Sequence, residues 1–233
     1  MTKILLVILS LMLSGCNTTN SFQKDIVLNN IEKLNRTAHN INFSVDEIIL
    51  LPAAKSYNYI IPKPVQSSVN NFFSNIDDLQ SATNCFLQGR GIDGINTVGR
   101  FLFNSTMGVF GLFDVASISG AEKIQNDFGI TLGKWGIPPG PYLVIPFVGP
   151  TSARDVVGIG INQIFNPLRK WNSEHYNFLS ILSIINYRAK IMHMTDLIKE
   201  ISIDHYSFIK NAYSKKREIM VHENLEDTMY DDE

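Results

Sequence analysis

The feature that most constrains this chain is a stretch of 19 residues, 135–153, without a single charged side chain. Such a stretch is long enough to span a bilayer as a helix. It also contains five prolines and three glycines. Each proline inside a helix removes a backbone hydrogen bond and costs about 3 kcal/mol, and lipid does not tolerate exposed irregular backbone. The sequence therefore predicts an apolar Pro/Gly-rich loop that packs in protein or lies at an interface.

The apolar excess extends beyond this stretch. Hydrophobic residues make up 45% of the chain and charged residues only 18%, whereas soluble domains carry about 25% charged residues. Such a composition is the opposite of that of a disordered chain. The net charge of −2 excludes a globally basic nucleic-acid binder, so we expect no nucleic-acid partner. Two cysteines are too few for a disulfide scaffold or a four-cysteine zinc site.

The N-terminus resembles a secretion signal that ends in a bacterial lipobox. Lys3 precedes an apolar run at 4–13, and the sequence Leu-Ser-Gly-Cys follows at 13–16. Cleavage before Cys16 would leave an acylated N-terminus, and several acyl chains together anchor a protein stably. By analogy with Gram-negative lipoproteins, Asn17 rather than Asp after the cysteine favours the outer membrane. An ordinary signal peptide with a chance cysteine is the alternative.

The rest of the chain is predicted to form one helical domain. We expect a signal peptide at 1–15, a lipidated N-terminus and tether at 16–27, the helical domain at 28–221, and an acidic, disordered tail at 222–233. With Cys16 acylated, Cys85 has no partner for a disulfide. Because Cys85 stands beside Phe86 and Leu87, we expect it to pack in the core.

Apolar residues recur at helical spacing through most of the domain, and no alternating strand pattern is longer than a few residues, so the predicted fold is all-α. Pro64 suits a first helical position. The apolar residues from Val65 to Leu79 mark an amphipathic helix, with a possible break near Asn75 and a restart capped by Asp77. Thr151 or Ser152 is expected to cap a further helix. From Glu174 onward the pattern predicts a long helix.

The chain has no positive signal for catalysis. Residues 89–94 match GxGxxG, but the segment before them is predicted to be helical, whereas a dinucleotide site needs a strand there. Walker A, GxSxG, HExxH and CxxC motifs are missing, and the five histidines are scattered. Asp77 and Asp78 are explained most simply as acidic residues at a helix start. We expect neither an enzyme nor a cofactor or metal site.

A series of motifs, in order along the chain, carries a family resemblance. They lie at 71–75 (NFFSN), 87–89 (LQG), 99–106 (GRFLFNST), 111–116 (GLFDVA), 126–129 (NDFG), 131–136 and 140–155, followed by Arg188, Asp204, Tyr206, Tyr213 and Arg217. Together they closely resemble the MlaA/VacJ family of outer-membrane lipoproteins. The resemblance covers roughly residues 31–222. One departure is Asn29-Asn30, where the family usually has Asp-Pro.

The resemblance implies a fold, a location and a function. The fold would be a ring of amphipathic helices lying in the inner, periplasmic leaflet of the outer membrane, anchored at Cys16. The partners would be phospholipid, a trimeric outer-membrane porin and a soluble periplasmic lipid carrier. The function would be to remove mislocalised phospholipid from the outer leaflet, without covalent chemistry. A surface-displayed or virulence-associated structural lipoprotein is the alternative, and a periplasmic lipid hydrolase is a third reading.

Three groups of residues are candidates for the site. Asn71, Phe72, Phe73 and Asn75 place apolar and polar side chains on adjacent helical turns and are candidates for the lipid path, with helix core and a capping Asn as the alternative. Gly140, Pro141, Pro146, Gly149 and Pro150 are candidates for a rim or gate, with plain packing as the alternative. Arg36, Arg100 and Arg154 are candidates for phosphate contacts. For Arg36 and Arg154, ion pairs with Glu32 and Asp155 are favoured instead.

Overall fold

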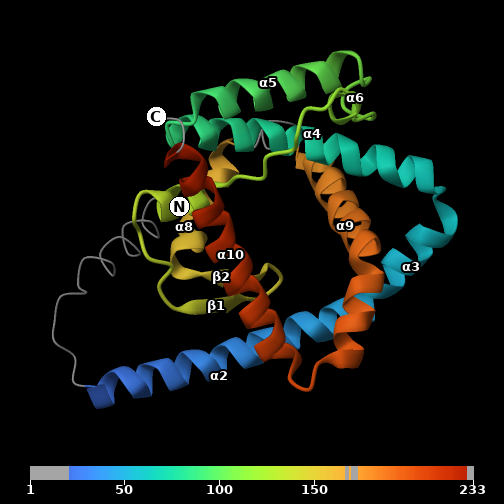
Figure 1. The fold of residues 1–233 in the computed structure, drawn as a ribbon. Coiled ribbons are helices and arrows are strands. Elements are labelled where there is room, and N and C mark those ends of the chain that lie inside the picture. The colour runs from blue at the N-terminus through green and yellow to red at the C-terminus, as the bar shows by residue number, and fades with distance from the viewer. Residues whose placement is uncertain (1–20, 166–167, 169–172, 230–233) are drawn as a thin grey trace.

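The computed structural model describes residues 21–165, 168 and 173–229 and is almost entirely helical (Figure 1). Its elements are α2 (Ser21–Val45), the π-helix η1 (Asp46–Leu50), α3 (Leu51–Ile60), α4 (Lys63–Leu87), α5 (Gly91–Thr106), α6 (Val115–Ile118), α7 (Phe128–Lys134), β1 (Tyr142–Ile145), β2 (Gly149–Ser152), α8 (Ala153–Phe165), α9 (Ser173–Ile201) and α10 (His205–Met229). The all-α fold class is thus confirmed, with one small hairpin added.

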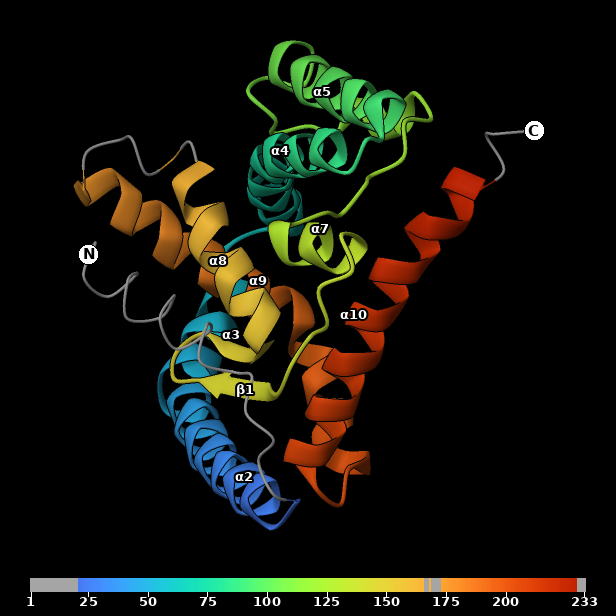
Figure 2. The same ribbon diagram turned by 90° about the vertical axis from the view of Figure 1, so that its left-hand side faces the viewer.

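The helices are arranged as a ring around a central opening (Figure 1). The chain follows α2, η1 and α3 as one helical path, because Val45, Leu50 and Leu51 all keep right-handed helical angles at the junctions. Pro62, with ψ 146°, ends this path and turns the chain into α4. Helices α9 and α10 then border the opening on two sides, and a view from the side shows α7 between α8 and the upper part of α10 (Figure 2).

Helix α4 differs from the sequence-based expectation. It runs unbroken from Lys63 to Leu87, so Asn75 does not interrupt it and Asp77 does not cap a second helix. Asp77 and Asp78 therefore lie in the middle of a helix, where neither stabilises a helix dipole. The break was wrong because Asn75, although a poor helix former, is held by tertiary contacts: it is 4% exposed, and its Nδ2 donates to Ser105 Oγ at 2.9 Å.

The Pro/Gly-rich loop contains a short antiparallel hairpin that the sequence did not predict. Strand β1 pairs with β2, with Val144 opposite Pro150 and Ile145 opposite Gly149. The edge of β1 is hydrogen-bonded by two asparagines of α2. Asn35 bonds both Tyr142 O and Val144 N at 2.8 Å, and Asn42 bonds Ile145 O at 3.0 Å and Phe147 N at 2.7 Å. These side chains supply the partners that an edge strand otherwise lacks.

Both ends of the helical domain extend further than expected. Helix α2 begins at Ser21, inside the stretch assigned to a tether, and α10 continues to Met229, inside the stretch assigned to a disordered tail. Cys16 lies outside the described residues. The expected long C-terminal helix is divided in two after Ile201, and the Asp204 carboxylate accepts from Ser207 N at 3.2 Å to cap α10. The Ser152 cap of α8 is confirmed by its contact with Asp155 N at 3.2 Å.

The interior and the surface are unlike those of an ordinary soluble domain. Many of the buried side chains are polar or charged, among them Asp78, Thr97, Arg100 and Asn104. Large apolar side chains such as Phe110 and Ile118 are instead exposed. Over the described residues, no helix combines the length and apolarity that crossing a membrane requires.

Candidate functional site

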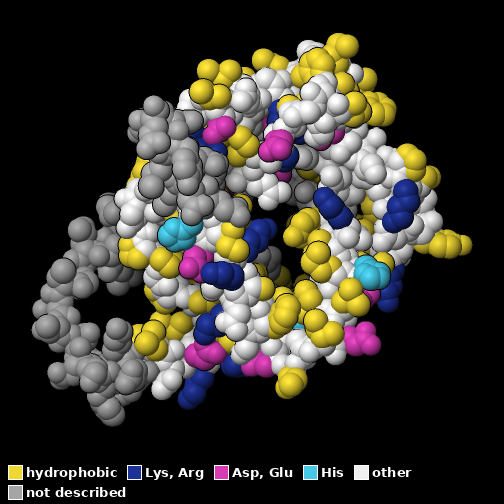
Figure 3. Space-filling view, in the orientation of Figure 1, with side chains coloured by type: hydrophobic (Ala, Val, Ile, Leu, Met, Phe, Trp, Pro, Cys, Tyr) yellow, Lys and Arg dark blue, Asp and Glu magenta, His cyan; other side chains and the backbone are white. Residues whose placement is uncertain are grey.

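The centre of the ring holds a cavity of about 510 Å³, within the range of small-molecule sites. Three helices and one extended segment form its wall. Helix α4 contributes residues from Asn70 to Ser81, α9 from Ser183 to Lys190, α10 from Tyr213 to Met220, and the segment before α7 contributes Lys123 and 125–127. The space-filling view shows the molecule hollowed here, between α9 and α10 (Figure 3). We call this space the central cavity.

Most of the residues that line the central cavity are polar or charged. They carry amide and hydroxyl groups together with both signs of charge, and Phe73, Tyr187, Tyr213 and Met220 add apolar surface to the wall. Large apolar side chains, among them Phe110 and Ile118, are exposed away from this cavity. A molecule with a polar headgroup and apolar tails matches this division between inside and outside.

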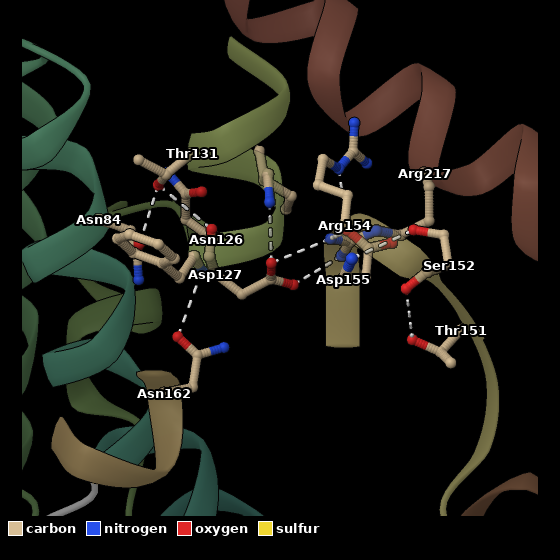
Figure 4. Close-up of polar contacts among 12 residues, drawn as sticks. Asn84, Asn126, Asp127, Thr131, Thr151, Ser152, Arg154, Asp155, Asn162 and Arg217 are labelled. Carbon is tan, nitrogen blue, oxygen red and sulfur yellow. Dashed lines mark hydrogen bonds and ion pairs between the residues drawn. The ribbon is translucent and has the colours of Figure 1, made fainter. Parts of the chain in front are cut away.

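Part of the wall is fixed by an ion-pair network that joins three helices (Figure 4). Arg217 of α10 contacts Asp127, at the start of α7, at 2.6 Å and Asp155 of α8 at 2.9 Å. Tyr213 Oη donates to the other oxygen of Asp155 at 2.6 Å. Burial alone would lower the pKa of Arg217, but the hydrogen bonds that Arg217 donates to Asp127 and Asp155 raise it above its ordinary value. The guanidinium therefore stays charged and holds α10 against α7 and α8.

A second network centres on Asp78 of α4 and Arg100 of α5. Asp78 is fully buried, with Lys123 Nζ at 2.5 Å and Arg100 Nε at 3.6 Å. Arg100 also contacts Asp114 at 3.1 Å and the carbonyl oxygen of Ala121. Burial raises the pKa of Asp78, and the hydrogen bond from Lys123 opposes that rise. This network fixes the segment between α6 and α7 against α4 and α5.

Of the four residues predicted to line a lipid path, only Phe73 lines the central cavity. Its ring packs edge-on against Phe72 at 5.3 Å between centroids. Asn71 Nδ2 donates to Leu112 O at 3.2 Å, and Asn75 donates to Ser105. The two asparagines thus hold the end of α5 and the turn that follows it against α4, while the lipid path stays a prediction for all four residues.

The residues predicted to form a rim or gate belong to the hairpin and its flanks. Pro141 O accepts from Ala153 N at 3.1 Å, Pro146 follows β1 directly, and Gly149 and Pro150 lie in β2. Positive φ angles at Gly140 (68°) and Gly149 (106°) explain the glycines there. None of the five lines the central cavity; Gly140 lines a separate cavity of about 320 Å³. A gate at this hairpin stays a prediction.

The three candidate arginines are all engaged within the chain. The expected ion pairs of Arg36 with Glu32 at 3.2 Å and of Arg154 with Asp155 at 3.1 Å are confirmed. Arg36 also contacts Asp204 at 3.0 Å, and this hydrogen bond holds the pKa of the Asp204 carboxyl well below its ordinary value. Carboxylates compensate the charges of these three arginines, so their contact with a phosphate stays a prediction. Other cationic side chains are better placed to contact a phosphate.

The glycine-rich stretch at 89–94 and the residue Cys85 both have the structural roles that the sequence predicted. Gly89, with φ 78°, lies in a turn between α4 and α5, so residues 89–94 join two helices and have no preceding strand. Cys85 is fully buried, and Asn126 Nδ2 contacts its Sγ at 3.6 Å. Burial raises the pKa of the Cys85 thiol, which leaves it a poor nucleophile. In the described part of the chain, no three His, Cys, Asp or Glu side chains are grouped as metal ligands.

Sequence reasoning missed the residues that give the central cavity its charge. Asp77 was assigned to a helix start, and Lys190 and Lys216 were not singled out, yet all three line the cavity. They come from α4, α9 and α10, and nothing in their local sequence distinguishes them from lysines and aspartates on an ordinary solvated face. Their position relative to one another is set only when the ring closes.

A ring that is helical apart from one short hairpin, with exposed apolar side chains and a central cavity lined mainly by polar residues, fits the class of lipid-handling lipoproteins. The chain belongs to the MlaA lipoprotein family, whose sequence model matches residues 28–220. It is 30% identical over 195 residues to the "Intermembrane phospholipid transport system lipoprotein MlaA" of Escherichia coli, covering 82% of this chain and 77% of that protein. The Haemophilus influenzae protein of the same name is 29% identical over 217 residues, covering 91% and 86%.

Two further comparisons agree with this assignment. An uncharacterized Rickettsia typhi protein is 39% identical over 193 residues, covering 82% of this chain and 76% of that protein. A solved structure described as "Structural basis for maintenance of bacterial outer membrane lipid asymmetry" has a TM-score of 0.73 at 29% identity. It covers 82% of this chain and 98% of the solved one. The likeness therefore extends from motifs to the arrangement of the helices.

Proposed function

We propose that this chain is an outer-membrane lipoprotein that removes mislocalised phospholipid from the outer leaflet and passes it toward the periplasm. The observation that carries the proposal is the division between a polar central cavity and an apolar exterior in a helical ring. The names of the relatives at about 30% identity support the same role. No step of this transfer makes or breaks a covalent bond, so the proposed role is transport and not catalysis.

The energetics of lipid transfer favour such an architecture. A phospholipid has about 30 methylene groups, and exposing them to water costs about 0.8 kcal/mol each, or roughly 25 kcal/mol in total. A transporter must therefore shield the tails while it gives the headgroup a polar path. The central cavity offers the polar path, and the apolar side chains outside the ring leave the tails in a lipid environment.

The proposal includes a location and partners. The ring would lie in the periplasmic leaflet, anchored by acylated Cys16, beside a trimeric porin, and would deliver lipid to a soluble periplasmic carrier. An apolar exterior is stable in one leaflet, and the described helices supply no segment that crosses both. Native purification from outer membranes should therefore recover a porin with this chain. Recovery without a porin would contradict this part of the proposal.

The central experiment is deletion of the gene. Cells without this chain should accumulate phospholipid in the outer leaflet and become sensitive to detergent with chelator, and the wild-type gene should restore them. An unchanged outer-leaflet composition would refute the transport role. Protease accessibility on intact cells would instead favour a surface-displayed structural lipoprotein, and release of lysophospholipid by the purified protein would favour a hydrolase.

The anchor is tested by Cys16→Ala. The variant should remain unprocessed at the lipobox and fail to restore the deletion strain, because a single uncleaved segment does not replace several acyl chains in the outer membrane. Metabolic labelling with a fatty acid should mark the wild-type protein and leave the variant unlabelled. Normal partition and full function of the variant would show that lipidation is dispensable.

A further inference from the structure

Three charged side chains of the central cavity form no ion pair with any described residue. Asp77 of α4 and Lys216 of α10 make no side-chain hydrogen bond or ion pair with any described residue. Lys190 of α9 contacts only the amide oxygen of Asn70, at 3.1 Å. The other charged side chains of the wall, Lys123 and Arg217 among them, are held in ion pairs. These three side chains are therefore not held in an ion pair and can contact a ligand, although Lys123 also acts on Asp77 electrostatically.

The three charges are placed on different walls. The carboxylate comes from α4, whereas the two ammonium groups come from α9 and α10. Asp77 is accessible to solvent, yet burial among surrounding atoms raises its pKa, with Asp78 adding to the rise and Lys123 opposing it. It thus lies in a concavity that water enters. An unpaired charge there is costly to desolvate unless a ligand supplies the opposite charge.

The sign pattern distinguishes between classes of ligand. A purely anionic ligand would meet attraction from Lys190 and Lys216 but repulsion from Asp77. A ligand that carries a phosphate diester and an ammonium group a few bonds apart would satisfy all three. Neutral donors and acceptors on the same wall, such as Gln80 and Ser183, can complete the contacts of its phosphate oxygens.

We propose that Asp77, Lys190 and Lys216 form a cradle that recognises a zwitterionic phospholipid headgroup, with the phosphate at the two lysines and the ammonium group at Asp77. The inference rests on the proposed transport of phospholipid and adds a headgroup preference to it. In this proposal the headgroup binds in the central cavity, where most of the lining residues are polar or charged. The acyl chains would lie away from this wall.

The test uses water-soluble short-chain lipids and the full-length lipoprotein purified in detergent. Binding of dihexanoyl phosphatidylethanolamine and dihexanoyl phosphatidylglycerol is measured by titration calorimetry, with inorganic phosphate and glycerophosphoethanolamine as further ligands. The wild-type protein should bind the ethanolamine lipid about tenfold more tightly than the glycerol lipid, the effect of one charge-assisted contact. Glycerophosphoethanolamine should compete and phosphate alone should not.

Single substitutions assign the roles. Asp77→Asn should weaken the ethanolamine lipid about tenfold and leave the glycerol lipid unchanged or tighter, so that the preference disappears. Lys190→Gln and Lys216→Gln should weaken both lipids by similar factors, because both lipids carry the phosphate. Two matched controls lie outside the central cavity: Lys215→Gln, next to Lys216 but paired with Glu218, and Asp196→Asn on α9. Both should bind like the wild type.

Two outcomes would overturn the cradle. One is equal affinity of the wild-type protein for the two lipids, a result that needs no variant to fold. The other is a preference that survives Asp77→Asn in a variant with wild-type thermal unfolding. These results are separate from failure of the transport role: a deletion strain with normal lipid asymmetry would refute transport, whatever the binding data show.

Discussion

At the scale of single residues, buried charges determine how the ring is held together. Arg217, whose side chain is 13% exposed, has carboxylates on both sides, from Asp127 and Asp155. The desolvation of three charged groups is costly, and only complete pairing offsets it. Removing Arg217 would therefore leave Asp127 without its cation, whereas Asp155 would keep its ion pair with Arg154.

The first prediction concerns this arginine. Arg217→Met should lower the free energy of unfolding by about 2 kcal/mol, because the half-buried Asp127 loses its cation and Asp155 keeps only Arg154. Thermal unfolding in detergent, followed by circular dichroism, measures the loss. The neighbouring Lys215→Met is the control, since Lys215 and Glu218 are both mostly exposed and their pair is screened by solvent. Equal stability of the two variants would contradict the role of the network.

Two histidines form another contact at this scale. His39 Nε2 lies 3.1 Å from His205 Nδ1, between α2 and the start of α10. Burial is the main cause that lowers the pKa of each below the ordinary 6.5, and Asp204 opposes the shift at both rings. Arg36 faces His39 and adds to its shift. Lys199 adds to that of His205, where Asp46 opposes it.

The second prediction is the pH dependence that follows. Since both folded-state pKa values are lowered, the unfolded chain binds more protons below 6.5. The stability present above 6.5 is therefore lost as the pH falls through that value towards the folded-state pKa values. Thermal unfolding from about pH 7.5 to about pH 5 should show this decline.

A matched variant isolates the histidine contribution. In His39→Gln with His205→Asn, amide groups stand near the ring nitrogens that meet, and no group titrates there. The decline over this pH range should become shallower in the double variant. If the stability of the double variant declined as steeply as that of the wild type, titrating groups other than these two histidines would be the cause.

At the scale of elements, close packing of helices depends on particular glycines. A Cβ atom at Gly158 of α8 would lie 2.5 Å from the backbone nitrogen of Gly129 in α7, a distance that real Cβ atoms do not reach. The two helices thus touch through their backbones. By contrast, Gly160, two residues further along α8, has no atom within 4 Å of the place that a Cβ would take.

The third prediction compares these two glycines. Gly158→Ala should destabilise the protein by about 2 kcal/mol, because overpacking forces α7 and α8 apart. Gly160→Ala should stabilise it by about 0.5–1 kcal/mol, since alanine is the better helix former and meets nothing there. Thermal unfolding of both variants measures the difference. Similar effects of the two substitutions would contradict direct backbone contact between the helices.

At the scale of the whole molecule, the ring has polar groups inside and apolar groups outside. A cluster of exposed apolar side chains lies at the end of α5 and in the turn to α6, and it comprises Met107, Val109, Phe110, Leu112, Phe113 and Ile118. Phe110 is 78% exposed. In water such a cluster would favour association, whereas in a leaflet it contacts acyl chains.

The fourth prediction tests this environment. A nitroxide attached at Phe110→Cys, with the protein in vesicles, should collide more often with dissolved oxygen, which concentrates in lipid, than with a water-soluble nickel complex. Labelling is selective because Cys85 is fully buried and Cys16 carries an acyl chain on its sulfur in the proposed lipoprotein. A label at Lys215→Cys is the control and should favour the nickel complex. Preference for the nickel complex at position 110 would place the cluster in water.

The sequence by itself determined those features of the fold that depend only on residues close together in the chain. Five prolines in residues 135–153 exclude a spanning helix because each acts on its own turn of backbone. Helical spacing predicted most of the helices for the same reason, and ordered motifs identified the family. Reasoning from neighbouring residues failed at Asn75, where a contact with Ser105, 30 residues away in sequence, helps to keep the helix intact.

Only the tertiary structure decided which residues meet. The hairpin at residues 142–152 depends on Asn35 and Asn42, which lie more than 100 residues earlier and supply its edge with hydrogen bonds. Asp77, Lys190 and Lys216 become one site because three helices close around the same cavity. A sequence records the charge of each side chain but not the distance between them. That distance is fixed by long-range packing, which no local pattern of residues contains.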